Sequence, residues 1–284
     1  ICAYNQNGIC KLGLLSTPDK EIKLILPKFT EIGRAGIKAS QEKFISILGS
    51  YDSGYKLYEY NIQDSQINQI SSKEDPDINK AYYSIPQNIE YETTELQQAN
   101  GFYYKPTNPL HKSSRKLPPL IVITHGGPTA ATNGTLNLEV QYWTSRGFAI
   151  LDVNYRGSTG YGTQYRKQLN GKWGIYDVED CINGAMHLVN KGEVNPNQLI
   201  IKGRSAGGYT ALAALTFSDV FTAGVSYYGI SDLTALAEET HKFESQYLDS
   251  MIGRYPENKQ EYEDRSPIFH IDKITSPILL FQGL

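Results

Sequence analysis

The apolar positions of the chain follow two different patterns, which change near residue 120. After Pro119, apolar runs of strand length alternate with helical patterns. A parallel sheet covered on both faces needs strands that are apolar throughout, so this alternation predicts a mostly parallel sheet with helices on both faces. The predicted strands are residues 120–124, 148–153, 199–202, 223–228 and 278–281.

The clearest helical pattern covers residues 175–191. Apolar side chains recur there at spacings of three and four, which places them on one face of a helix. They are Val178, Cys181, Ile182, Ala185, Met186 and Val189. A second helical run is predicted at residues 209–215.

The first 81 residues contain short strands and an internal repeat. Lys11-Leu12 recurs 45 residues later as Lys56-Leu57, and strands predicted at 9–15 and 22–26 recur at 55–62 and 66–70. Another strand is predicted at 44–48. A period of about 45 residues built of strands is typical of β-propeller blades, although a chance match in a β-rich region is the alternative. We therefore predict the last blades of a propeller at 1–81 and an α/β domain at 82–284.

Charge and composition narrow the classes of function. The net charge is −3, and both signs are spread along the chain without a basic block or an acidic tail. This argues against a nucleic-acid partner and against an anionic membrane surface. The longest apolar runs, such as 211–215, are far shorter than the roughly 20 residues that cross a bilayer. No zinc, P-loop or paired-cysteine motif occurs, so we expect no metal and no cofactor.

The cysteines and the chain ends bear on location. Cys2, Cys10 and Cys181 are too few for a disulfide framework, so free thiols and a cytoplasmic location are expected, with a Cys2–Cys10 bridge as the alternative. The chain opens without Met and closes on an apolar run, and we expect an internal piece of a longer protein. The missing signal peptide then says little about location, and nothing in the sequence indicates an oligomeric state.

The motif that carries the most chemistry is Gly-Arg-Ser-Ala-Gly-Gly at 203–208. It follows a predicted strand and precedes a predicted helix, which is the context of a nucleophile elbow. Glycines permit the tight turn, and the helix N-terminus favours developing negative charge. We predict that Ser205 is the nucleophile of an α/β-hydrolase; an ordinary glycine-rich turn is the alternative.

Two further loops follow predicted strands at the same edge of the sheet. In Thr-His-Gly-Gly-Pro at 124–128, the glycines let backbone amides approach a substrate oxygen, so Gly127 and Ala206 are the predicted oxyanion donors. His125 could be mistaken for a base, and we expect it to shape the loop. In the loop 154–162, Arg156 either anchors a carboxylate or, as we favour, holds the loop by hydrogen bonds.

These three motifs, in this order, resemble the prolyl oligopeptidase family of serine peptidases. The nearest likeness is to its acylaminoacyl-peptidase and dipeptidyl-peptidase-like members. The resemblance covers residues 82–284 well and the N-terminal strands loosely. Further matching positions are Trp173-Gly174 with Asp177 and Asp180, and Arg265-Ser266-Pro267 with Ser276-Pro277.

The resemblance implies a propeller that caps an α/β-hydrolase domain, excludes folded proteins and admits short peptide substrates. It assigns Ser205 as nucleophile, Gly127 and Ala206 as oxyanion donors, and the S1 wall near Tyr227 and Tyr228. For the two tyrosines, plain core aromatics at a strand end are an equal alternative. The chain departs from many members in having Ala206 rather than Tyr after the nucleophile, and the paired glutamates of some dipeptidyl peptidases cannot be placed.

The acid and the base of the triad are not found in the sequence. In this fold they follow the nucleophile in the order acid, then histidine. His111, His125 and His187 precede Ser205, His241 lies in a polar stretch, and His270 precedes the last strand. Both groups are therefore expected beyond Leu284. Loss of the base alone costs on the order of a million-fold in turnover, so these residues alone should be nearly inert.

Cleavage specificity, whether prolyl, acylaminoacyl or dipeptidyl, is not indicated. Two other functions remain open at this point. One is an esterase on the same fold, which the propeller-like repeat disfavours. The other is a protein without catalysis whose propeller binds partners.

Overall fold

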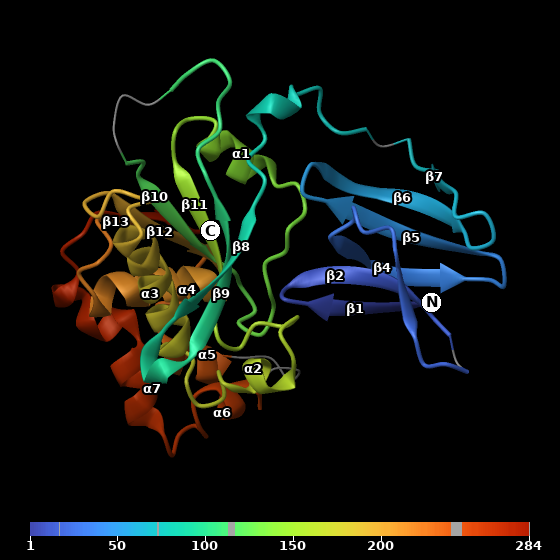
Figure 1. The fold of residues 1–284 in the computed structure, drawn as a ribbon. Helices are drawn as coiled ribbons and strands as arrows, with labels where there is room; N and C mark the ends of the chain where they lie inside the picture. Colours follow the sequence, from blue (N-terminus) through green and yellow to red (C-terminus); the bar gives the residue numbers. More distant parts are fainter. Residues whose placement is uncertain (17, 73, 113–116, 240–245, 284) are drawn as a thin grey trace.

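A seven-stranded mixed sheet organises the larger part of the molecule (Figure 1). The computed structural model describes residues 1–16, 18–72, 74–112, 117–239 and 246–283. The strand order is β14-β13-β12-β10-β11-β9-β8, and the five strands from β10 to β14 are parallel. The strands are β8 (Gln87–Glu92), β9 (Gln98–Tyr104), β10 (Leu120–Thr124), β11 (Ala149–Asn154), β12 (Leu199–Arg204), β13 (Ala223–Tyr227) and β14 (Ile278–Phe281).

Helices cover both faces of this sheet, so the predicted fold class is confirmed. α3 and α4 pack on one face with Leu120, Val122 and Leu151, whereas α1 packs on the other with Ile121 and Ile150. The helices are α1 (Leu138–Thr144), α2 (Thr163–Lys167), α3 (Tyr176–Asn190), α4 (Ala206–Phe217), α5 (Leu233–Glu239), α6 (Tyr247–Met251) and α7 (Lys259–Arg265). Short 3-10 helices are η1 (Lys80–Tyr82), η2 (Thr94–Leu96) and η3 (Pro267–Lys273).

Two antiparallel sheets lie beside the larger domain, shown in blue in Figure 1. One is β1 (Cys2–Gln6), β2 (Ile9–Leu15) and β3 (Ile22–Ile25); the other is β4 (Glu31–Ala39), β5 (Lys43–Ser50), β6 (Ser53–Asn61) and β7 (Ile67–Gln69). They share a core that includes Leu12, Phe44 and Leu48. The sequence repeat therefore corresponds to the last two strands of each sheet, β2-β3 and β6-β7.

The second antiparallel sheet contacts the segment that precedes α1. The Leu136 amide donates to the Ser50 carbonyl at 2.8 Å, and the Thr30 hydroxyl donates to the Gly134 carbonyl at 3.2 Å. The Asn133 amide donates to the Tyr55 hydroxyl at 3.2 Å. These contacts hold the chain just after the glycine loop 124–128, so the N-terminal strands reach close to the predicted site.

Cys2, Cys10 and Cys181 are all free thiols, and the Cys2–Cys10 bridge is not formed. Within the described residues, no helix has the length and apolar character required to span a membrane.

Candidate active site

Ser205 stands at the sharp turn between β12 and α4. Its backbone adopts φ 55° and ψ −124°, a conformation that non-glycine residues rarely take, and its side chain is exposed. The Ser205 amide donates to the Tyr227 carbonyl of the next strand at 3.0 Å. The strained elbow predicted from the sequence is confirmed, and no described residue forms a hydrogen bond with the Ser205 hydroxyl.

Glycine is required on both sides of this turn because backbone from other elements lies in contact with it. A Cβ on Gly207 would overlap the Thr124 carbonyl oxygen at the end of β10, and one on Gly203 would overlap the carbonyl of Gly207 itself. The elbow and the end of β10 can approach this closely only without side chains there. This packing brings the loop 124–128 against the nucleophile.

The predicted oxyanion donors lie on the two sides of Ser205. A Cβ on Gly126 would come within 3.6 Å of the Ser205 Cβ, and the next residue, Gly127, is exposed with φ 132°. Ala206 is the first residue of α4, and the amides of a first helical turn have no intrahelical acceptor. Backbone amides therefore flank the serine, as an oxyanion hole requires.

His125 bonds to its own loop and to the loop after β11, so it shapes the loop, as expected. Its Nδ1 lies 2.8 Å from the Gly126 carbonyl oxygen and its Nε2 lies 2.8 Å from the Ser158 hydroxyl. The imidazole stacks on Tyr155 with ring centroids 4.2 Å apart. Burial lowers its pKa to about 4, so the ring is neutral at pH 7. With both nitrogens engaged elsewhere, His125 is not a base for Ser205.

Arg156 holds its loop and faces no solvent, which confirms the structural role. The fully buried guanidinium pairs with the Asp180 carboxylate of α3 at 2.8 Å, and the Arg156 amide donates to the same carboxylate at 2.6 Å. Its Nη2 also donates to Thr94 at 2.8 Å, and the guanidinium stacks on Tyr176 at 3.6 Å. The loop after β11 is therefore anchored to α3 by a buried ion pair.

The two tyrosines predicted near the S1 wall face different surroundings. Tyr227 is half-buried, stacked on Phe281 of β14 with centroids 4.7 Å apart, while the Arg204 guanidinium lies 5.1 Å from its ring. Tyr228 is exposed, has the unusual φ of 41°, and donates its amide to the Phe281 carbonyl at 2.6 Å. A bulky residue with positive φ next to the elbow is a site of local strain.

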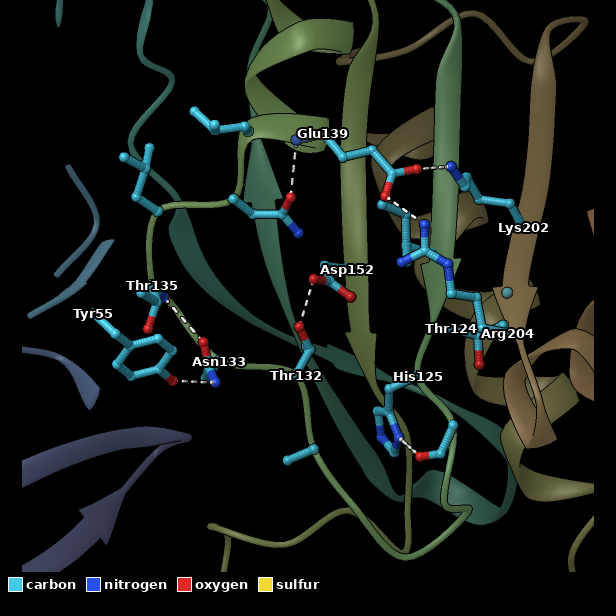
Figure 2. A pocket seen from close by; sticks show the side chains of 17 residues that line it. Tyr55, Thr124, His125, Thr132, Asn133, Thr135, Glu139, Asp152, Lys202 and Arg204 are labelled. Atoms are coloured by element: carbon cyan, nitrogen blue, oxygen red, sulfur yellow. Dashed lines mark hydrogen bonds and ion pairs between the residues drawn. The ribbon is translucent and has the colours of Figure 1, made fainter. Parts of the chain in front are cut away.

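A polar cavity of about 660 Å³ lies on the α1 face of the sheet, next to the elbow (Figure 2). In this cavity Glu139 pairs with Lys202 and Arg204, whereas Asp152 accepts a hydrogen bond from the neutral Thr132 hydroxyl at 2.5 Å. Burial raises the pKa of Asp152 to about 7, with Glu139 adding to the effect.

The other histidines that the structure describes do not reach the elbow. His187 packs near Tyr91, His270 contacts Phe217 edge-on, and His111 is exposed; His241 lies outside the described residues. Across the part of the chain that the structure describes, no group of three or more His, Cys, Asp or Glu side chains could hold a metal ion.

The sequence assigns no positioning role to Ser158 or to Asp177, although Asp177 is among the positions that match the family. Ser158 lies in the loop 154–162, in which the glycines and Arg156 carry the sequence signal. Asp177 accepts from the Gly174 amide at 2.6 Å and the Thr210 hydroxyl at 2.5 Å, which ties α3 to α4 behind the elbow. Burial raises the pKa of Asp177 to about 6. An acidic residue at a helix start was the available signal, but it does not identify the partner.

Comparison with known proteins agrees with the geometry. The sequence model of the prolyl oligopeptidase family (Peptidase_S9) matches residues 135–284. Dipeptidyl peptidase family member 6 of Caenorhabditis elegans is 35% identical over 171 residues, covering 58% of this chain and 23% of that protein. The acylamino-acid-releasing enzyme of Arabidopsis thaliana is 31% identical over 183 residues, covering 61% of this chain and 24% of that protein.

A solved structure resembles nearly the whole chain. The puromycin-hydrolyzing peptidase of Mycobacterium tuberculosis is 38% identical with a TM-score of 0.93, covering 98% of this chain and 42% of that one. The N-terminal sheets and the α/β domain therefore occur together in a relative. The chain spans about a quarter of the length of these curated relatives.

Proposed function

Because the chain belongs to the prolyl oligopeptidase family of serine peptidases, we propose that the intact protein hydrolyses short peptides through an acyl-enzyme on Ser205. By intact protein we mean the natural protein that contains these residues. The observation that carries the proposal is the turn with positive φ at Ser205, which exposes this residue beside Gly127, itself exposed.

The chemistry follows from this arrangement. The Ser205 oxygen attacks the substrate carbonyl carbon as its proton passes to a histidine base. The resulting oxyanion accepts hydrogen bonds from the amides of Gly127 and Ala206. The C–N bond then breaks, the amine leaves with the proton, and water hydrolyses the ester on Ser205.

The acid and the base of the triad are the groups that this proposal requires from elsewhere. β14 lies beside β13, and in this fold the acid follows the strand at this position, with the histidine after it. We propose that both come from residues beyond Leu284. Reading the gene past that point tests this directly: an Asp or Glu shortly after Leu284, followed by a His, is expected.

The substrate class is proposed to be short peptides. A relative described as puromycin-hydrolyzing supports amide substrates with a single aminoacyl group, because puromycin is an aminoacyl amide. The adjacent antiparallel sheets support exclusion of folded proteins by a propeller. Hydrolysis of aminoacyl-nitroanilides and of puromycin by the intact protein measures this preference, and activity on esters alone would favour the esterase.

The decisive experiment is active-site labelling. A fluorophosphonate should label the intact protein, and Ser205→Ala should abolish labelling while leaving the fold unchanged by circular dichroism. No labelling of the unsubstituted protein would contradict the proposal and favour a binding protein without catalysis. Residues 1–284 alone should hydrolyse no aminoacyl-nitroanilide measurably, because the proposed base lies beyond them.

A further inference from the structure

Ser158 lies behind the predicted oxyanion loop and touches it through one side chain, that of His125. We propose that Ser158 is a positioning residue: by donating to Nε2 of His125, it fixes the ring tautomer that holds the Gly126 carbonyl and so turns the Gly127 amide toward the substrate. The inference rests on the proposed function, in which Gly127 is an oxyanion donor.

The direction of the Gly127 amide follows from peptide geometry. The Gly126–Gly127 peptide bond is trans, and in a planar trans peptide the carbonyl and the following N–H point in opposite directions. The Gly126 carbonyl faces the His125 ring, which lies against the loop after β11 through Tyr155 and Ser158. Because β10 lies between β11 and β12, the Gly127 N–H points to the β12 side, where Ser205 stands.

The tautomer of His125 decides whether this arrangement holds. A carbonyl oxygen only accepts hydrogen bonds, so Nδ1 must carry the proton when it bonds to Gly126. A neutral imidazole has one N–H, so Nε2 must then accept, and the Ser158 hydroxyl at 2.8 Å is the donor. In the other tautomer, the Nδ1 lone pair would face the Gly126 oxygen and repel it.

Ser158 is itself held rigidly. Its side chain is fully buried, and its amide donates to the Tyr155 carbonyl at 2.9 Å. The same loop is anchored by the Arg156–Asp180 ion pair. The hydroxyl therefore has a fixed position from which to donate, so a chain of contacts runs from α3 through Ser158 and His125 to the peptide of Gly127.

Two measurements on the intact protein test the proposal. Histidine labelled with ¹⁵N should show His125 protonated at Nδ1, and Ser158→Ala should shift it toward the other tautomer. The same variant should lower kcat on an aminoacyl-nitroanilide by about 10- to 100-fold with KM nearly unchanged, less than the 10²- to 10³-fold loss of a whole oxyanion donor. Ser158→Thr keeps the hydroxyl and should restore most of kcat.

A matched control separates positioning from general loss of a buried hydroxyl. Ser84 is also buried and donates to the Lys105 carbonyl at 2.6 Å, but it lies outside the site. Ser84→Ala should leave kcat and the His125 tautomer unchanged. If Ser158→Ala behaves like this control, or changes the tautomer without lowering kcat, the proposal is wrong.

Substitution of His125 gives a second test that does not depend on how Ser158→Ala folds. Asn places an amide N–H near the position of Nδ1, whereas Gln places one near Nε2. His125→Asn should therefore retain more kcat than His125→Gln, and the reverse order would overturn the proposal. An inactive unsubstituted protein would instead refute the proposed function and with it the effect of Ser158 on kcat, while the Ser158→Ala spectrum would still decide whether Ser158 sets the tautomer.

Discussion

The two flanks of Ser205 are built very differently. On the β10–β11 flank, His125 is hydrogen-bonded to Ser158, and Arg156 in the same loop as Ser158 forms a buried ion pair with Asp180. On the β13–β14 flank, Tyr228, Leu279, Leu280 and Phe281 are between 45% and 63% exposed. Under the proposed function, the first flank holds the predicted oxyanion loop in place, whereas the second presents exposed apolar side chains. The acid and the base of the triad are proposed to come from residues beyond Leu284.

The largest effect is expected where the two flanks meet. In the intact protein, Ser205→Ala should lower kcat on an aminoacyl-nitroanilide by on the order of a million-fold, because the bond-forming oxygen is removed. Steady-state kinetics measures the loss. A residual rate within a hundredfold of the unsubstituted protein would show that another group is the nucleophile.

The next effect tests the rigidity of the β11 side. Asp180→Ala would remove the only fully buried carboxylate among the described residues that pairs with the Arg156 guanidinium, and breaking a buried ion pair typically costs about 3–5 kcal/mol of unfolding free energy. Urea denaturation of the intact protein measures this. Glu179→Ala is the matched control: Glu179 contacts the same guanidinium at 3.1 Å but is partly exposed, so its loss should cost about 1 kcal/mol or less. Equal losses of unfolding free energy in the two variants would show that the buried ion pair stabilises the fold no more than the partly exposed contact does.

The third effect is a pH dependence of the unfolding free energy, caused by Asp152 on the same side of the site. Burial raises the pKa of Asp152 from 3.8 to about 7, so between these values the folded protein binds a proton that the unfolded chain does not. The contribution of Asp152 to unfolding free energy therefore falls as pH rises from about 4 to 7. Asp152→Asn, which still accepts from Thr132, should remove this slope and be the more stable form at pH 8. Denaturation at several pH values measures it, and parallel curves would contradict the assignment.

The smallest effect is expected on the open flank. Leu280 is 63% exposed, so Leu280→Ser should change the unfolding free energy of residues 1–284 by no more than about 0.5 kcal/mol. Leu151→Ala, in the core of the same sheet, should cost about 2–5 kcal/mol. A large loss for Leu280→Ser in the intact protein, but not in residues 1–284, would show that another segment covers this flank.

Much of the larger domain could be predicted because its strands are apolar throughout. The predicted 120–124 and 278–281 coincide with β10 and β14, and α3 begins and ends within one residue of the prediction. β1 and β4 were missed. β4 contains Gly33 and Gly36, and its register shifts between Ile32 and Ile37, so no alternating pattern persists. Short helices such as α6, with five residues, are too brief for a helical period to show.

In the site, the residues fixed by local turn geometry could be predicted, whereas the contacts between residues far apart in the sequence could not. Ser205 and the glycine loop could be found because turn geometry demands particular residues at adjacent positions. The partners of His125 and Arg156 could not, because Ser158 is 33 residues away from the first and Asp180 is 24 residues away from the second. Such pairings depend on which strands and helices are neighbours in space.

The burial of α4 has a consequence for the local opening of the protein. All of its residues from Ala206 to Thr216 are buried, between the sheet and α3. Amides in such a helix exchange with solvent only through extensive opening, so they should be among the slowest in the protein by hydrogen–deuterium exchange. Ser205, the proposed nucleophile, directly precedes this helix and should therefore keep its position while more exposed parts of the surface open.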